Sequence, residues 1–171
     1  MQYIPETVKI NKLEAEALYG GIMIDTNNFT NRTGVRTFEA AAYLKKNGAD
    51  ITRVRRMFRD DIVDYKTKAA AIQNTEIYKE EYAISVCAGK DASSSTVVGA
   101  QVANELLNVK GVKASFVCTP YNDQIYISAR SIDKINVQLI MEEFGGGGHM
   151  NLAGAQVRDK SCLLYTSDAA D

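Results

Sequence analysis

The chain has 171 residues, enough for one ordinary domain or two small lobes, and 46% of them are hydrophobic, as is normal for a packed protein. Its formal net charge of −1 argues against the broad basic surface that long nucleic acid requires, but leaves room for a local positive pocket for a small anion. No run of about 18 apolar residues occurs, so the sequence predicts no membrane span. The cysteines, Cys87, Cys118 and Cys162, lack metal-ligand spacing and suit a reducing cytosol.

The first part of the chain is predicted to be mostly helical. Apolar residues at helical spacing predict a helix over 7–19, which Gly20-Gly21 should end. A short apolar stretch follows and leads to Asp25, and an acid at the end of a buried strand is a frequent metal-ligand position. Further helices are expected over 37–47, from Asp50 to Arg59 and over about 62–75. The last of these is polar enough to connect two lobes.

The pattern changes near Tyr78. Strands are predicted over 82–88, 113–119 and 124–131, and helices over 97–107 and 136–144. The serines at 93–95 are most simply a helix N-cap. The order strand, helix, hairpin, helix predicts an α/β fold in which helices cover a small sheet, with a boundary near residues 76–81.

The last ten residues need separate treatment. Residues 162–171 read CLLYTSDAAD, which looks like the translation of a transposon-end adapter used in sequencing libraries. The alternative is a genuine polar tail. We interpret the segment as an artefact, leave it out of the fold prediction, and expect the natural sequence to continue beyond Ser161.

A glycine run is the sharpest feature: Gly145, Gly146, Gly147 and Gly148, followed by His149, the only histidine of the chain. Such a run costs conformational entropy, and its N–H groups can cradle a phosphate where the backbone must approach closely. If residues 151–155 begin a helix, the helix dipole would help. His149 can add a hydrogen bond but cannot form a histidine metal site by itself. A flexible helix C-cap beside a surface histidine explains the run equally well.

The strand over 124–131 precedes this run by about fifteen residues. Because side chains alternate along a strand, one face is apolar and the other carries an aromatic ring, a hydroxyl and a guanidinium. The apolar face has Ile125, Ile127 and Ala129, and the polar face has Tyr126, Ser128 and Arg130. Arginine binds phosphate with a planar fork, and tyrosine can stack on a base. The alternative is a solvated sheet face, which the nearby glycine run makes less attractive.

An aspartate and a group of arginines in the first part of the chain have simple structural explanations. Asp25 has the carboxylate that Mg²⁺ and Mn²⁺ prefer, but one aspartate cannot hold a metal, and by spacing alone it is more often a turn or cap residue. The arginines at 53, 55, 56 and 59 are most simply a solvated helix face near Asp60, Asp61 and Asp64.

Three segments resemble a known family. GGGGHMNLAGAQV looks like the signature loop of DHHA1 domains, and ISARS at 127–131 looks like their substrate-facing strand. GIMIDTNNFTNRT at 21–33 looks like the last conserved segment of the DHH domain. Over residues 1–161 the chain resembles the catalytic end of the DHH–DHHA1 phosphodiesterases, specifically the GdpP type that hydrolyses cyclic di-AMP.

The resemblance implies a domain plan and a mechanism. Residues 1–75 would be the C-terminal part of a DHH domain, and 76–161 a truncated DHHA1 substrate-binding domain. In this family two Mn²⁺ ions, held by aspartates and histidines, activate water for attack on phosphorus, and the product is pApA. Asp25 matches the final metal-ligand aspartate. The matches to the substrate-binding side are Ser128, Arg130, Gly145–Gly148 and His149.

The chain also departs from the family pattern. The Asp-x-Asp, the further aspartate and the Asp-His-His that complete the metal site are absent as a set. We therefore expect the chain alone to be inactive, although it can still bind nucleotide weakly. The family also implies regulatory segments outside this sequence, a membrane anchor that holds the full-length protein at the cytoplasmic face of the bacterial plasma membrane, and a possible homodimer.

Two other functions stay open. A nanoRNase that cuts short linear oligonucleotides would share the glycine loop and the ISARS strand. A non-catalytic, RNA-binding DHHA1 module is the other, but the net charge and the DTNNF segment argue against it.

Overall fold

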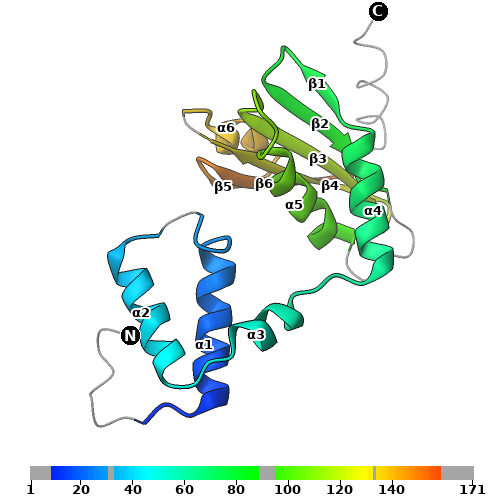
Figure 1. The fold of residues 1–171 in the computed structure, drawn as a ribbon. Coiled ribbons are helices and arrows are strands. Elements are labelled where there is room, and N and C mark those ends of the chain that lie inside the picture. The colour runs from blue at the N-terminus through cyan, green and yellow to red at the C-terminus, as the bar shows by residue number, and fades with distance from the viewer. Residues whose placement is uncertain (1–8, 31–32, 89–94, 133, 159–171) are drawn as a thin grey trace, which may run out of the picture. The chain divides into compact units, whose positions relative to one another are not determined.

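The computed structural model describes residues 9–30, 33–88, 95–132 and 134–158 (Figure 1). The chain divides into two compact units after Arg59, and each is considered by itself. Residues 162–171, interpreted as an artefact, lie outside the described ranges. Within those ranges, no helix combines the length and the apolar content that a membrane crossing needs.

The first unit is a small helical cluster of α1 (Lys12–Asp25), α2 (Val35–Lys46) and α3 (Ile51–Met57). A capping box starts α1, in which the Asn11 side chain accepts from the Glu14 N–H (3.0 Å) and the Glu14 carboxylate accepts from the Asn11 N–H (2.9 Å). The three helices of this unit share one core, formed by Ala15, Tyr19, Met23, Ala41, Leu44, Ala49 and Val54.

The prediction that Gly20-Gly21 ends the first helix is wrong. Helix α1 continues through both glycines to Asp25. Gly20 instead permits close packing, because a Cβ at this position would lie 3.2 Å from Cζ of Phe58 and 3.5 Å from Cγ1 of Val54. The apolar residues before Asp25 are therefore helical, and Asp25 does not end a buried strand.

The second unit is a mixed six-stranded sheet covered by helices, which confirms the predicted α/β fold (Figure 1). The strand order is β1-β2-β3-β4-β6-β5; β2 and β3 pair in parallel and all other neighbours are antiparallel. The strands are β1 (Glu76–Tyr78), β2 (Tyr82–Val86), β3 (Ala114–Tyr121), β4 (Gln124–Ser131), β5 (Gly147–His149) and β6 (Leu152–Val157). Helix α5 (Ser95–Leu106) connects the parallel pair, as such a crossover requires.

Helices cover both faces of this sheet. Helices α4 (Ile62–Gln73) and α5 lie on one face, where Ser85 Oγ donates to Ala71 O (2.7 Å) and Ser115 Oγ donates to Ala103 O (2.6 Å). Helix α6 (Val137–Glu143) lies on the other face, over the strands β4 and β6. Two hydrophobic cores therefore sandwich the sheet.

Helix α4 was expected to connect two lobes, but it packs as part of the second unit. Ala71 belongs to the same core as Ala83 and Cys87. The compact division therefore falls after Arg59 rather than after residue 75. Compactness does not locate the border between a DHH and a DHHA1 domain, and a border near residue 75 stays a prediction.

Two helical glycines should respond to alanine with opposite signs. A Cβ at Gly99 of α5 would collide with Oγ1 of the buried Thr119, so we expect Gly99→Ala to destabilise the second unit by about 1–3 kcal/mol. A Cβ at Gly21 of α1 would have nothing within 4 Å, so Gly21→Ala should stabilise the first unit by up to about 1 kcal/mol. Amide hydrogen exchange, which resolves the two units, measures both effects. Equal responses in the two variants would contradict the packing described.

Candidate functional site

Strand β4 has the two faces that its sequence predicts. Ile125, Ile127 and Ala129 are buried in the core under α6. The side chains that alternate with them, those of Tyr126, Ser128 and Arg130, are half-buried on the opposite face. Ser128 pairs with Val117 of β3, whose side chain lies in the core under α5, so this polar face is the α5 face of the sheet.

Ser128 lies in a row of residues without bulky side chains. It pairs with Gly154 of β6, and Gly154 pairs with Gly147 of β5. Because directly paired residues point to the same face, the two glycines leave the surface beside the Ser128 hydroxyl free of side chains. A flat ligand can therefore approach the sheet backbone here.

A surface pocket of about 440 Å³ lies at this row. Its lining brings together Ser128 and two residues of the glycine run, Gly145 and Gly146. The remaining lining residues are Thr96, Tyr126, Ile127, Gly154, Ala155 and Gln156. Arg130, Gly147, Gly148 and His149 do not line the pocket, although Arg130 is two residues from Ser128 on the same strand face, about 7 Å along the strand.

The glycine run forms a helix end and an edge strand, not a phosphate-cradling loop before a helix. The N–H groups of Gly145 and Gly146 donate to the carbonyl oxygens of Glu142 and Met141 at the end of α6, each at 2.9 Å. The helix considered over 151–155 does not form, because β6 occupies this segment. The N–H groups of Gly145 and Gly146 are therefore not available to a ligand, and no helix over 151–155 supplies a dipole.

Packing explains some of these glycines but not all of them. A Cβ at Gly146 would collide with Gly154 O and lie 2.6 Å from Ala155 Cα, and a Cβ at Gly148 would lie 2.6 Å from Ala153 Cα. These two glycines let the run lie tightly against β6. A Cβ at Gly147, in contrast, would meet nothing within 4 Å, so the packing of the unit leaves this position unexplained.

Arg130 is held in place by neutral partners. Its Nε donates to Oδ1 of Asn104 on α5 (3.0 Å), and Nη1 donates to the carbonyl oxygens of Ala129 (2.9 Å) and Ala153 (3.5 Å). Burial lowers the pKa of the Arg130 guanidinium, but arginine stays charged in proteins. Among the described residues no carboxylate pairs with it and Nη2 has no hydrogen-bond partner. Arg130 is thus an oriented cation with unused donors.

The sequence reasoning missed several pocket residues. Thr96 lies in the first turn of α5, next to the serines 93–95, of which only Ser95 is described. Gly154 and Gln156 point to the pocket face because they alternate with the buried Ala153 and Ala155 on β6. The alternation of side chains along this segment could have indicated a strand with one face toward the pocket. The sequence analysis instead considered the segment as the start of a helix that follows the glycine run.

A family model described as the DHHA1 domain matches residues 79–169, more than half of the chain. The chain belongs to the DHHA1 domain family. The match begins in the turn between β1 and β2 and includes β4, β5 and β6, so the pocket beside Ser128 lies within the DHHA1 domain.

The similarity to two cyclic-di-AMP phosphodiesterases extends over more of the chain than the DHHA1 domain does. The chain is 44% identical over 159 residues to the cyclic-di-AMP phosphodiesterase PdeA of Listeria monocytogenes, covering 92% of this chain and 24% of that protein. It is 44% identical over 161 residues to the cyclic-di-AMP phosphodiesterase GdpP of Geobacillus thermodenitrificans, covering 93% and 24%. The chain therefore spans about a quarter of the length of these relatives.

The fold is shared with a solved structure. A crystal structure of an exopolyphosphatase-related protein from Bacteroides fragilis matches with a TM-score of 0.79 at 23% identity, over 92% of this chain and 50% of that one. At this identity the likeness concerns the fold alone.

Asp25 lies outside the DHHA1 domain, as the last residue of α1, and its side chain is exposed. In the described parts of the chain, no three His, Cys, Asp or Glu residues are grouped closely enough to hold a metal ion. These residues do not form a two-manganese site by themselves, so Asp25 as one ligand of such a site stays a prediction.

The glycine run offers a matched pair of substitutions. We expect Gly146→Ala to destabilise the DHHA1 domain by about 1–3 kcal/mol, because the new methyl group overlaps the β6 backbone. Gly147→Ala should change stability by less than about 0.5 kcal/mol, because its methyl group enters open space. Urea unfolding followed by circular dichroism distinguishes the two. A comparable loss in both variants would show that Gly147 is also a packing residue.

Proposed function

We propose that the chain supplies the substrate-binding part of a phosphodiesterase that hydrolyses cyclic di-AMP to pApA. The observation that carries this proposal is the open row of Ser128, Gly154 and Gly147, which has an aromatic ring and a guanidinium on the same sheet face. The 44% identity to cyclic-di-AMP phosphodiesterases over most of the chain supports this choice of substrate.

Each polar group on this face has a proposed role. Tyr126 is steadied by an edge-on contact with Tyr121, whose ring centroid lies 6.2 Å away, and offers a surface on which an adenine can stack. The Ser128 hydroxyl can donate to a phosphate oxygen. Arg130, oriented by Asn104, supplies a charge-assisted hydrogen bond from Nη2. Gly147 admits the ligand to the sheet surface, and His149 at the end of β5 is a further contact.

Hydrolysis is proposed to need more than this chain. By the resemblance to GdpP-type phosphodiesterases, hydrolysis would need two Mn²⁺ ions, for which Asp25 would be one ligand. The described residues group no three His, Cys, Asp or Glu side chains that could hold a metal ion, so the remaining ligands would come from elsewhere. We accordingly expect the chain alone to bind substrate without cleaving it. Membrane attachment of the full-length protein and a homodimer are likewise proposals that follow from the family.

Binding of cyclic di-AMP to the 171-residue chain tests the proposal by isothermal titration calorimetry. We expect saturable binding that Arg130→Gln weakens about 10- to 100-fold, because a charge-assisted hydrogen bond contributes about 1.5–3 kcal/mol. Gly147→Val should also weaken binding, since its side chain would fill the open row. Lys110→Gln, which removes an exposed charge outside the pocket lining, is the matched control and should bind like the original chain.

Other outcomes would change the assignment. Binding of short linear RNA with no binding of cyclic di-AMP would favour the nanoRNase. Equal weakening by Arg130→Gln and Lys110→Gln would mean that net charge, rather than the pocket, attracts the ligand. Circular dichroism of each variant separates loss of binding from loss of fold.

A further inference from the structure

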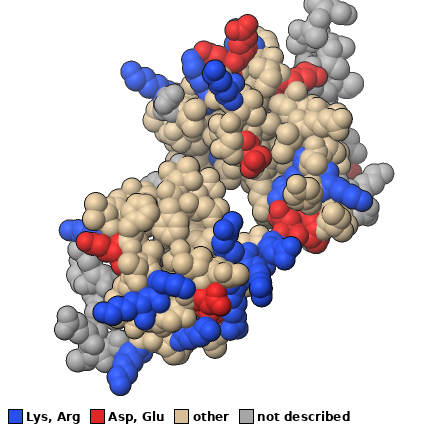
Figure 2. Space-filling view, viewed as in Figure 1, with Lys and Arg blue, Asp and Glu red and all other residues tan. Residues whose placement is uncertain are grey.

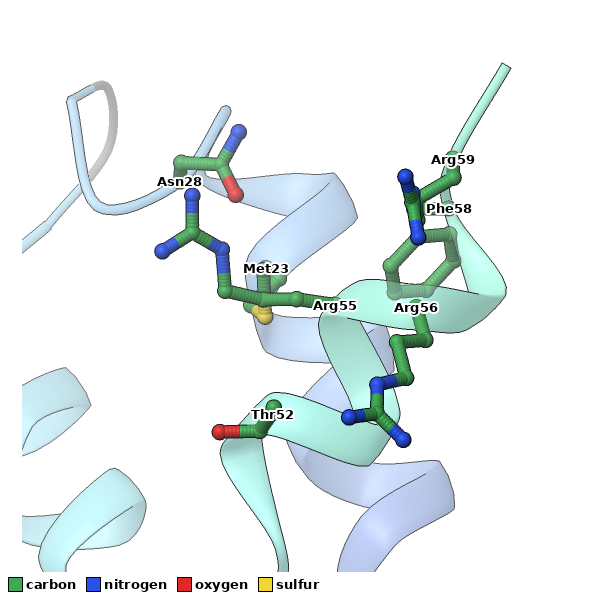
Figure 3. A pocket seen from close by; sticks show the side chains of 7 residues that line it. All are labelled: Met23, Asn28, Thr52, Arg55, Arg56, Phe58 and Arg59. Atoms are coloured by element: carbon green, nitrogen blue, oxygen red, sulfur yellow. The ribbon is translucent and has the colours of Figure 1, made fainter. Parts of the chain in front are cut away.

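The first unit has a pocket of its own, with a volume of about 500 Å³ (Figure 3). It is basic: three of the seven residues that line it are arginines, and none is acidic. The lining residues are Met23, Asn28, Thr52, Arg55, Arg56, Phe58 and Arg59. All of them belong to the first compact unit, so the pocket is complete within it.

The charges of these arginines are not neutralised within the described parts of the chain. Their neighbour Arg53 pairs with the buried Glu16 (Nε to Oε2, 3.5 Å). No ion pair between described residues joins Arg55, Arg56 or Arg59 to a carboxylate. Figure 2 shows basic side chains gathered over this unit on the face in view.

The nearby acids, expected to lie close to these arginines, have other partners. Asp60 pairs with Lys68, and the Asp61 side chain accepts from the Asp64 N–H (2.8 Å) at the start of α4. The arginines lie on an exposed helix face, as predicted, but these acids do not neutralise them. Positive charges near the C-terminus of α3 stabilise this helix through its dipole. Helix stability alone does not explain why polar groups from another element also line the pocket.

A strained turn contributes one of those polar groups. Asn27, Asn28 and Phe29 have φ values of 46°, 57° and 66°, in the left-handed region that is costly for residues other than glycine. Phe29 is fixed there by the rings of Tyr19 and Phe38, at centroid distances of 5.9 and 5.7 Å. Its N–H also donates to Thr26 Oγ1 (2.9 Å), so the turn is well determined.

This turn holds Asn28 at the pocket. Figure 3 shows Arg55 extending toward Asn28, and Arg59 beside the Phe58 ring. Thr52 and Arg56, four residues apart on α3, lie on one face of the helix. The guanidinium groups fan out along the pocket instead of meeting at one point, which suits a ligand with more than one anionic group. The Asn28 amide and the Thr52 hydroxyl can add neutral hydrogen bonds to it.

We propose that this pocket binds the phosphate groups of a small polyanion, either free pyrophosphate or the diphosphate of a nucleotide. Arg55, Arg56 and Arg59 supply planar, charge-assisted donors that match phosphate oxygens. The Met23 and Phe58 side chains form apolar surface that a sugar or base can contact. The proposal does not depend on cyclic di-AMP binding beside Ser128, because it uses residues of the first unit alone.

Titration of the ¹⁵N-labelled chain with pyrophosphate, followed by NMR, tests the proposal residue by residue. We expect saturable shifts of the Asn28, Thr52, Arg55, Arg56 and Arg59 signals. Arg55→Gln/Arg56→Gln should raise the Kd at least about 10-fold, since each lost charge-assisted hydrogen bond contributes about 1.5–3 kcal/mol. Both arginines are exposed, so the variant should keep its fold. A parallel titration with adenosine diphosphate distinguishes the sources: tighter binding assigns the pocket to a nucleotide, and equal binding to free pyrophosphate.

Arg36→Gln/Lys46→Gln is the matched control. It removes two exposed positive charges from α2 in the same unit, and neither residue lines the pocket. This variant should bind like the original chain. Equal weakening by both double variants would overturn the proposal in favour of general charge attraction, and so would a titration without saturable shifts at the five residues. Arg55→Lys/Arg56→Lys, which keeps the charge but not the planar fork, should bind with intermediate affinity.

Discussion

The alternation of side chains along β4 is the constraint on which the second unit depends. One set of residues closes the core under α6, and the other set lies on the opposite face, where Tyr126 and Ser128 line the pocket. A shift of one residue in the pairing with β3 or β6 would exchange these sets, placing Arg130 in the core and Ile127 on the surface. The burial of Ile125, Ile127 and Ala129 therefore fixes the position of the polar face. The register therefore sets both the stability of the unit and the position of the proposed ligand-binding face.

The glycine run shows how one sequence feature can meet two demands. Gly146 and Gly148 satisfy the packing of the run against β6, and Gly147 opens the surface beside Gly154 and Ser128. From sequence alone the run can be a helix cap or a ligand loop. In the structure it is a helix end followed by an edge strand, and only the position of Gly147 is left for a ligand to explain. The choice between the two readings thus applies to each glycine separately.

The fold was predictable where local signals and tertiary packing agree. The faces of β4 and the Asp50 cap of α3 follow directly from residue type and spacing. Prediction failed where tertiary contacts override local preference. Gly20 costs helix stability locally, yet α1 continues through it, and a Cβ there would press against Phe58 in the packed unit. Strand β1 has only three exposed residues and forms because it pairs with β2, so its own sequence offered little signal.

The site was only partly predictable, because charge and pairing are properties of the folded chain. A net charge of −1 suggests a neutral surface, yet no ion pair between described residues neutralises Arg55, Arg56 or Arg59, while Asp60 forms an ion pair with Lys68 and Asp61 caps α4. Sequence proximity of arginines to aspartates does not imply pairing, since α4 carries its acids into the second unit. A chain with nearly balanced charge can therefore contain a local anion pocket, provided that its acids have partners other than the arginines of the pocket. Asp60 and Asp61 meet this condition, because both have partners on α4.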